Sequence, residues 1–224
     1  MPRVSSQSTI RNTITLSDDE WQTVLSLMTG PCTISQMVKA GIERHTAEIV
    51  RVKILSAIVQ EQQTVGHANN VEMVFETVPD KQKRAKTTDI ENEKGWQIAI
   101  AADADGHYTG TILPEGSILK YENGGYVSEY VDDWLEVHGV NTVTVLDPGN
   151  HIEIAWHGFI STFRSVTMKY LNEYLQWFCF LRQQEMIGKS KLETVFALWQ
   201  LLSKYERTLT NRNFRNRSKQ KKTF

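Results

Sequence analysis

The chain has 224 residues, of which 40% are hydrophobic and 23% are charged. These are ordinary values for a soluble globular protein of one or two domains with a proper hydrophobic core. No apolar run approaches the roughly 18 residues of a membrane span, and the N-terminal residues lack the apolar core of a secretory signal. The two cysteines, Cys32 and Cys179, provide neither a disulfide framework nor a four-thiolate zinc site, and we interpret them as reduced structural thiols of an intracellular protein.

The formal net charge of −1 conceals an asymmetry. The segment 207–222 holds seven basic residues and no acid, so the rest of the chain carries −8. A basic end on an acidic body indicates contact with nucleic acid or a nuclear-import signal, and a disordered, solubilising tail is the alternative. The tail residues predicted to contact DNA are Arg212, Arg215, Arg217, Lys219, Lys221 and Lys222.

We expect residues 1–14 to form a flexible arm and residues 15–62 to form a domain of three helices. Ser17 and Thr33 are predicted N-caps, and three acids in the first turn after Ser17 suit the helix dipole. On the third helix, the predicted apolar stripe is Ile49, Val52, Leu55 and Val59, widened by Ile54 and Ile58. The helices are expected at 17–29, 33–39 and 44–62.

The second and third helices fit a helix-turn-helix. Gly41 lies where such motifs need a turn residue without a Cβ atom, and Met37, Ala47 and Val50 fall at packed positions. Three-helix units are also common as pure packing modules, and the acids on the third helix weaken its positive charge. If the unit binds DNA, the third helix offers a groove Arg44, His45, Arg51 and Lys53.

We expect residues 63–205 to form a second domain with a mixed sheet and a helical end, followed by a basic tail at 206–224. Apolar and polar residues alternate in 71–76, and the highly charged segment 79–95 is predicted to be a flexible loop. Strands are expected at 71–76, 96–101, 107–113, 117–121 and 142–146, and helices at 128–138, 152–163, 167–182 and 191–205.

Glu153 is a candidate ligand for a divalent cation, because it lies near the start of a predicted helix just after the turn residues Asp147-Pro-Gly. Two bound cations can clamp the attacking and leaving oxygens of a phosphodiester, which requires about three convergent carboxylates. A single Glu near a helix start is more often a favourable contact with the helix dipole. His151 and His157 are further possible ligands or else ordinary surface or core residues.

The segment 147–183 resembles the C-terminal part of Merlin-type DDE transposases and their bacterial insertion-sequence relatives. It contains their N-x-I-E-x-x-W pattern, with the acid at Glu153, followed by similar Lys-Tyr-Leu, Tyr-Leu and Trp-Phe pairs. Weaker likeness extends to 114–126, 71–78 and 15–57, the regions of the second acid, the first acid and the preceding helical domain. The resemblance implies an α/β fold in which a three-helix helix-turn-helix precedes an RNase H-like mixed-sheet domain with a helical C-terminus.

Departures from the family pattern predict a catalytically inactive site. Phe75 stands at the position of the first acid and Tyr121 at that of the second, and only Glu153 stays in register. Strand alternation is expected to point Glu76 and Glu122 away from the site, so that they cannot replace the lost acids. The family's basic helix after Glu153 and its zinc ribbon are also missing. These departures predict no catalytic residue, no bound metal and no cofactor.

The sequence therefore supports three hypotheses. The first is a domesticated, catalytically inactive transposase that acts as a DNA-associated or regulatory factor. The second is a protein-interaction scaffold of a larger nuclear complex that does not itself bind DNA, and the third is an active metal-dependent transposase or nuclease. DNA is the expected partner, a protein partner or a homodimer is compatible with each, and no membrane association is expected. The expected location is the nucleus if the source is eukaryotic and otherwise the cytoplasm.

Overall fold

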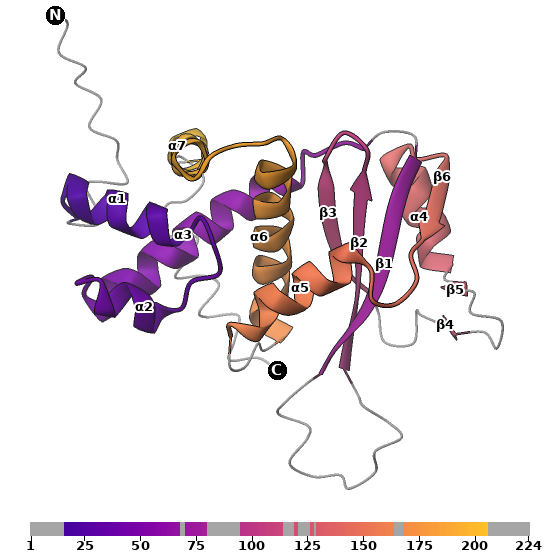
Figure 1. The fold of residues 1–224 in the computed structure, drawn as a ribbon, viewed down its shortest axis with the longest axis horizontal. Coiled ribbons are helices and arrows are strands. Elements are labelled where there is room, and N and C mark those ends of the chain that lie inside the picture. Colours follow the sequence, from indigo (N-terminus) through magenta and orange to yellow (C-terminus); the bar gives the residue numbers. More distant parts are fainter. Residues whose placement is uncertain are drawn as a thin grey trace, which may run out of the picture. The chain divides into compact units, whose positions relative to one another are not determined.

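The computed structural model describes residues 16–67, 70–79, 95–113, 119–120, 126–127, 129–163 and 168–205. It is an α/β protein with seven helices and a four-stranded mixed sheet in this described part, drawn in Figure 1. The chain divides into two compact units. The first contains the described residues up to Glu61 and those from Lys189 onward, and the second contains the described residues between Gln62 and Gly188. None of the described helices is both long enough and apolar enough to cross a bilayer.

The three predicted N-terminal helices are confirmed. Capping boxes start α1 and α2, because Ser17 and Thr33 each exchange hydrogen bonds with the residue three positions later. Gly41 follows α2 with a φ of +95°, a backbone conformation that favours glycine. The helices are α1 (Asp18–Leu27), α2 (Ile34–Lys39) and α3 (Arg44–Gln62).

The buried stripe of α3 differs from the predicted one at Val52. Ile54, Leu55 and Ile58 are buried as predicted, as is Val50, but Val52, placed in the stripe by the sequence, is 39% exposed. The second half of this helix carries apolar residues around most of its circumference, so the helical period did not decide which face packs inward.

Helix α7 (Lys191–Lys204) belongs to the first unit, which corrects the prediction that residues 63–205 form one domain. The rings of Trp199 on α7 and Trp21 on α1 meet edge to face, with centroids 5.9 Å apart. At the other end of α7, the Lys204 ammonium and the Tyr205 hydroxyl donate to the Glu61 carboxylate at 2.6 and 2.7 Å. The final helix therefore completes the core of the N-terminal helices.

The second unit is built on a sheet with the strand order β3-β2-β1-β6. Strand β1 pairs antiparallel with β2 and parallel with β6, and β2 pairs antiparallel with β3. The predicted strands and the helices that follow them are observed close to their expected places. Their bounds are β1 (Asn70–Pro79), β2 (Gly95–Asp103), β3 (Tyr108–Leu113), β6 (Thr142–Val145), the short pair β4 (Leu119–Lys120) and β5 (Tyr126–Val127), α4 (Glu129–His138), α5 (His151–Ser161) and α6 (Met168–Met186).

The two faces of the sheet have separate cores. Val71 and Met73 of β1 pack in one cluster with Trp134 of α4, and Phe75 packs against this cluster. Helices α5 and α6 contact the strands on the side opposite α4 (Figure 1). There, Gly110 of β3 lies so close to Leu175 of α6 that an added Cβ atom would overlap the leucine side chain.

We predict that Gly110→Ala lowers the free energy of unfolding by about 1–3 kcal/mol, because the new methyl group must displace a buried leucine. Gly158→Ala is the matched control. Gly158 lies within α5 with open space where a Cβ would be, so alanine should raise stability by roughly 0.5–1 kcal/mol. Urea denaturation of the two variants measures both effects. Equal stability of Gly110→Ala and the unaltered protein would contradict the close packing of α6 on β3.

We also predict a pH-dependent contribution from the contact of α7 with Glu61. Burial alone would raise the pKa of this carboxyl, but hydrogen bonds from Lys204 and Tyr205 outweigh burial and lower it below 4.5. A lowered folded-state pKa stabilises the protein above the pKa of the unfolded chain, and this stabilisation is lost as the pH falls through the folded-state pKa. Glu61→Gln should therefore cost up to about 1 kcal/mol at pH 7 and progressively less below pH ~4. Glu48→Gln, at an exposed pair, should cost less at pH 7.

Candidate metal centre

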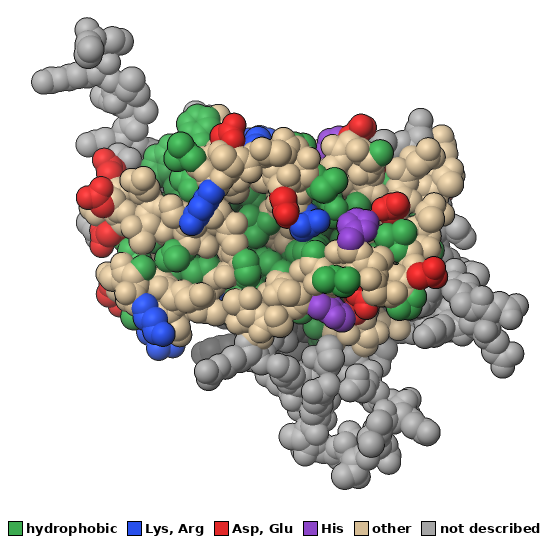
Figure 2. All heavy atoms as spheres, viewed as in Figure 1, with side chains coloured by type: hydrophobic (Ala, Val, Ile, Leu, Met, Phe, Trp, Pro, Cys, Tyr) green, Lys and Arg blue, Asp and Glu red, His purple; other side chains and the backbone are tan. Residues whose placement is uncertain are grey.

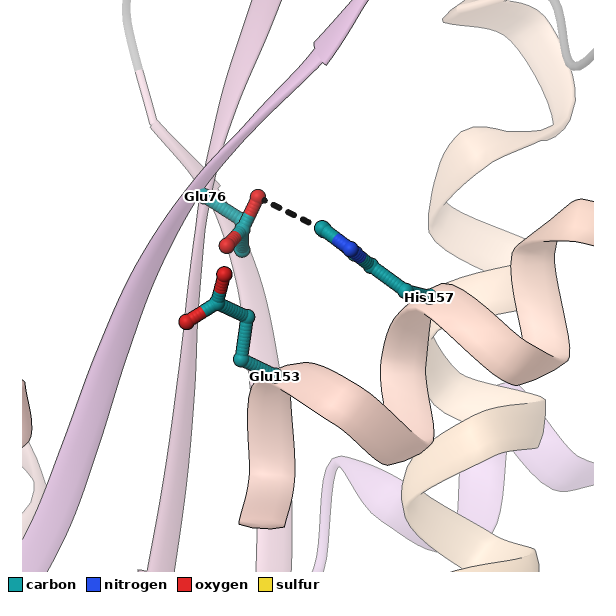
Figure 3. A group of neighbouring side chains, drawn as sticks. All are labelled: Glu76, Glu153 and His157. Atoms are coloured by element: carbon teal, nitrogen blue, oxygen red, sulfur yellow. Dashed lines mark hydrogen bonds and ion pairs between the residues drawn. The ribbon is translucent and has the colours of Figure 1, made fainter. Parts of the chain in front are cut away.

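Glu76, Glu153 and His157 converge at the junction of β1 and α5. One ligand atom from each lies within 4.8 Å of the other two. The Nε2 atom of His157 is 3.2 Å from Oε2 of Glu76. Figure 3 shows Glu76 reaching from the strand toward the two side chains of the helix. Two carboxylates and an imidazole from distant parts of the chain thus face one point.

The start of α5 is held by its own polar residues. The Asn150 side chain accepts hydrogen bonds from the backbone N–H groups of Ile152 and Glu153, both at 3.0 Å, which caps the helix. The N–H of Gly149 donates to Oε2 of Glu153 at 2.6 Å. Glu153 and His157 are four residues apart, so they project from the same side of the helix. The helix start therefore orients the carboxylate, and helical geometry brings the imidazole beside it.

The prediction that Glu76 points away from Glu153 is wrong. Neighbouring residues of β1 do alternate between the two faces of the sheet, but Phe75 packs with the cluster that contains Trp134 of α4. Glu76 consequently points toward α5 and Glu153. The sequence analysis placed Phe75 on the site face because it aligned with the family's first acid. This placement assigned both Phe75 and Glu76 to the wrong face of the sheet.

The environment of Glu76 disfavours an isolated negative charge. Its side chain is 14% exposed. Burial raises the pKa of the Glu76 carboxyl, the hydrogen bond and charge of His157 oppose that rise, and the neighbouring Glu153 carboxylate adds to it. His157 lies at the solvent side of the group, with 58% of its side chain exposed. A cation placed between the two carboxylates would offset both the burial and the mutual repulsion of the acids.

The other residues singled out by the sequence are distributed as follows. Phe75 belongs to the opposite core, and Tyr121, Glu122 and the tail 206–224 lie outside the described residues. On α3, His45 is exposed and Arg44 pairs with Glu48 at 3.3 Å.

Two predicted DNA contacts on α3 are less accessible than expected. Lys53 is only 1% exposed, which corrects its prediction as a DNA contact, since it lies between apolar neighbours that turn inward. Arg51 is partly buried. The accessible basic positions on this helix are therefore concentrated at its start.

Sequence reasoning missed the pairing of Glu76 with His157. A signal for His157 was present, since it follows Glu153 by one helical turn. No such signal exists for Glu76, because alternation shows which residues share a face without showing what covers that face. Comparisons of the chain with protein-family models, with curated proteins and with solved structures find no match. The interpretation of the site therefore rests on the geometry of its own residues.

Proposed function

We propose that the chain is a DNA-associated protein of transposase type in which Glu76, Glu153 and His157 bind a divalent cation for phosphodiester cleavage or strand transfer. The observation that carries this proposal is the convergence of Glu76 with Glu153. The expectation of an inactive site rested on the loss of the acids at Phe75 and Tyr121 and on Glu76 and Glu122 facing away, and the reason that concerns Glu76 no longer holds. The mixed sheet, with the first candidate acid on β1, supports the RNase H-like interpretation.

The donor set fits a divalent cation. Two carboxylates balance the charge of the ion, and carboxylate oxygens with one imidazole nitrogen suit Mn²⁺ or Zn²⁺. When bound, such an ion polarises a phosphoryl oxygen and lowers the pKa of a coordinated water. Three protein donors leave coordination positions open for water and phosphate oxygens. A pair of cations needs three or more carboxylates, so this site fits one cation better than two. The hydrogen bond from Gly149 would keep Glu153 oriented during binding.

We predict that the protein binds Mn²⁺ and nicks supercoiled DNA in its presence. Glu153→Gln and Glu76→Gln should each reduce both binding and nicking by at least about 100-fold, because each removes a charged donor. Glu72→Gln is the control, since Glu72 is an exposed carboxylate on the same strand outside the cluster. Mn²⁺ binding followed by calorimetry and nicking followed on gels give independent readouts. DNA binding without Mn²⁺ binding or nicking would instead favour the hypothesis of a catalytically inactive, DNA-associated factor.

Two features support DNA contact. Helices α2 and α3 with the turn at Gly41 support the helix-turn-helix interpretation, and Arg44 and His45 are exposed at the start of α3. On the face drawn in Figure 2, the described Lys and Arg side chains are scattered among acids and apolar groups rather than gathered in one patch. We therefore propose that the basic tail supplies most phosphate contacts and that α3 contributes to orientation.

We predict that full-length protein binds random-sequence duplex DNA with an affinity that falls steeply with salt. A variant ending at Glu206 loses seven basic residues. Because each phosphate contact contributes about 0.9 to the slope of log affinity against log salt, the slope should decrease by several units. Arg44→Ala in the full-length chain should weaken binding with a slope change of about one or less. Fluorescence anisotropy across a salt series measures both effects. An unchanged slope after truncation would exclude the tail as a source of phosphate contacts.

A second candidate function is a protein-interaction module, favoured by an apolar groove of about 540 Å³ on α1 and α7. Leu192 and Phe196 are 73% and 59% exposed there, which is unusual for large apolar side chains. Two acidic residues, Asp18 and Glu193, also line it, so an amphipathic helix with basic flanks is the occupant that matches its charge. Absence of DNA binding at low salt would favour this function over the first. The groove lining is completed by Trp21, Gln22, Leu25, Val195 and Trp199.

A further inference from the structure

A second cluster of ionisable side chains lies at the turn between β2 and β3, and it shares no residue with the first. Asp103, Asp105 and His107 each place a ligand atom within 4.8 Å of the others. The Nδ1 atom of His107 is 3.0 Å from Oδ2 of Asp103. From the segment before β1, His67 places its own Nδ1 atom 3.5 Å from the same oxygen. Two imidazoles therefore approach one carboxylate oxygen.

The turn accounts for only one of the two oxygen atoms of the Asp103 carboxylate. Its Oδ1 atom accepts hydrogen bonds from the backbone N–H groups of Asp105 at 3.0 Å and His107 at 2.9 Å, which closes the turn. Gly106 completes the turn with a φ of +83°. The Oδ2 atom is not needed for this geometry. It forms a hydrogen bond with Nδ1 of His107 and also faces the His67 imidazole. The Asp103 side chain is fully buried, so a negative charge there requires a close positive partner.

His67 provides an independent indication of a ligand. Its side chain is fully buried, and its Nε2 atom is 2.7 Å from the Thr109 hydroxyl oxygen. Its Nδ1 atom, which points at Asp103, is buried and has no hydrogen-bond partner. The roles of the two ring nitrogens depend on the tautomer. With the proton on Nδ1, the imidazole pairs with Asp103 at 3.5 Å. With the proton on Nε2, which then donates to Thr109, the lone pair of Nδ1 faces the carboxylate oxygen, and a cation between the two would turn this contact into a favourable one. A hydrogen bond that holds the far nitrogen is the usual way in which proteins orient a metal-ligating histidine.

We infer that Asp103, Asp105 and His107 bind a transition-metal ion of the Zn²⁺ type, and that His67, which contacts Asp103 but lies outside this group of three, moves in as the fourth donor when the ion binds. Two imidazoles and two carboxylates form a donor set suited to that ion, and the carboxylates balance its charge. With bonds of 2.0–2.1 Å, tetrahedral ligand atoms lie about 3.3–3.4 Å apart. The separations of 3.0 and 3.5 Å from Oδ2 of Asp103 to the two histidine nitrogens lie on either side of this value. The ion would join the β2–β3 turn to the residues before β1, a structural role separate from phosphodiester chemistry.

The experiment uses full-length protein dialysed against a chelator and titrated with Zn²⁺ by calorimetry and with Co²⁺ by visible absorption, which reports the ligand geometry. His107→Ala and Asp105→Asn should each weaken binding by at least tenfold and remove the tetrahedral Co²⁺ spectrum. Glu153→Gln should retain that spectrum, because it alters only the other cluster. His45→Ala controls for adventitious binding to an exposed histidine, and it should behave like the unaltered protein.

The thermal midpoint provides a second measurement. Zn²⁺ should raise the midpoint of the unaltered protein and of Glu153→Gln, because a ligand that binds only the folded state stabilises it. When Asp105→Asn is combined with Glu153→Gln, which disables the other cluster, Zn²⁺ should leave the midpoint unchanged. Asp105 is exposed, so this substitution should not itself prevent folding. No Zn²⁺ or Co²⁺ binding by the unaltered protein would overturn the inference. Binding lost in Glu153→Gln but kept in His107→Ala would overturn it too, and would assign the ion to the Glu76 cluster.

Discussion

Burial of β1 on both faces is the constraint on which the second unit depends. Val71 and Met73 point toward α4, whereas Val74, buried to 2% exposure, shares the opposite face with Glu76. The middle of the strand is thus covered on both faces, although Glu72 near its start remains exposed. Glu76 is therefore held in an environment that disfavours its charge, and the nearby His157 only partly compensates. Such a carboxylate is costly as a structural element, which is the physical reason for assigning it a ligand.

The position of its partners depends on aromatic packing between α5 and α6. The rings of Trp156 and Phe178 meet edge to face at 5.3 Å, and those of Phe159 and Trp177 do so at 5.4 Å. These contacts fix the rotation of α5 about its own axis, since the buried aromatic residues occupy the side of the helix that packs inward. Glu153 stands on the same helix with its orientation set by the Gly149 N–H. The site geometry is thus a consequence of core packing, because the helix cannot rotate without breaking the ring contacts.

The sequence predicted the elements well and the site less well, for different physical reasons. Helix starts depend on local chemistry, so Ser17 and Thr33 identify the first two without tertiary information. What covers a given face of a strand or helix is decided by distant residues, which is why Glu76 and Val52 were both assigned to the wrong side. The packing of α7 in the first unit could not be predicted either, because the spacing of apolar residues along an amphipathic helix does not show which other element covers its apolar face.

Both ligand clusters depend on the register of β1. Asp103 is the register partner of Val71 near the start of the strand, whereas Glu76 pairs with Ile98 five residues later. This spacing corresponds to about 17 Å, too far for the two clusters to share an ion. A slip of one residue would move Phe75 to the α5 face and place Glu76 in the apolar cluster around Trp134, away from Glu153 and His157. The same apolar pattern that stabilises the sheet therefore holds each cluster in place, while the two sets of donors remain chemically independent.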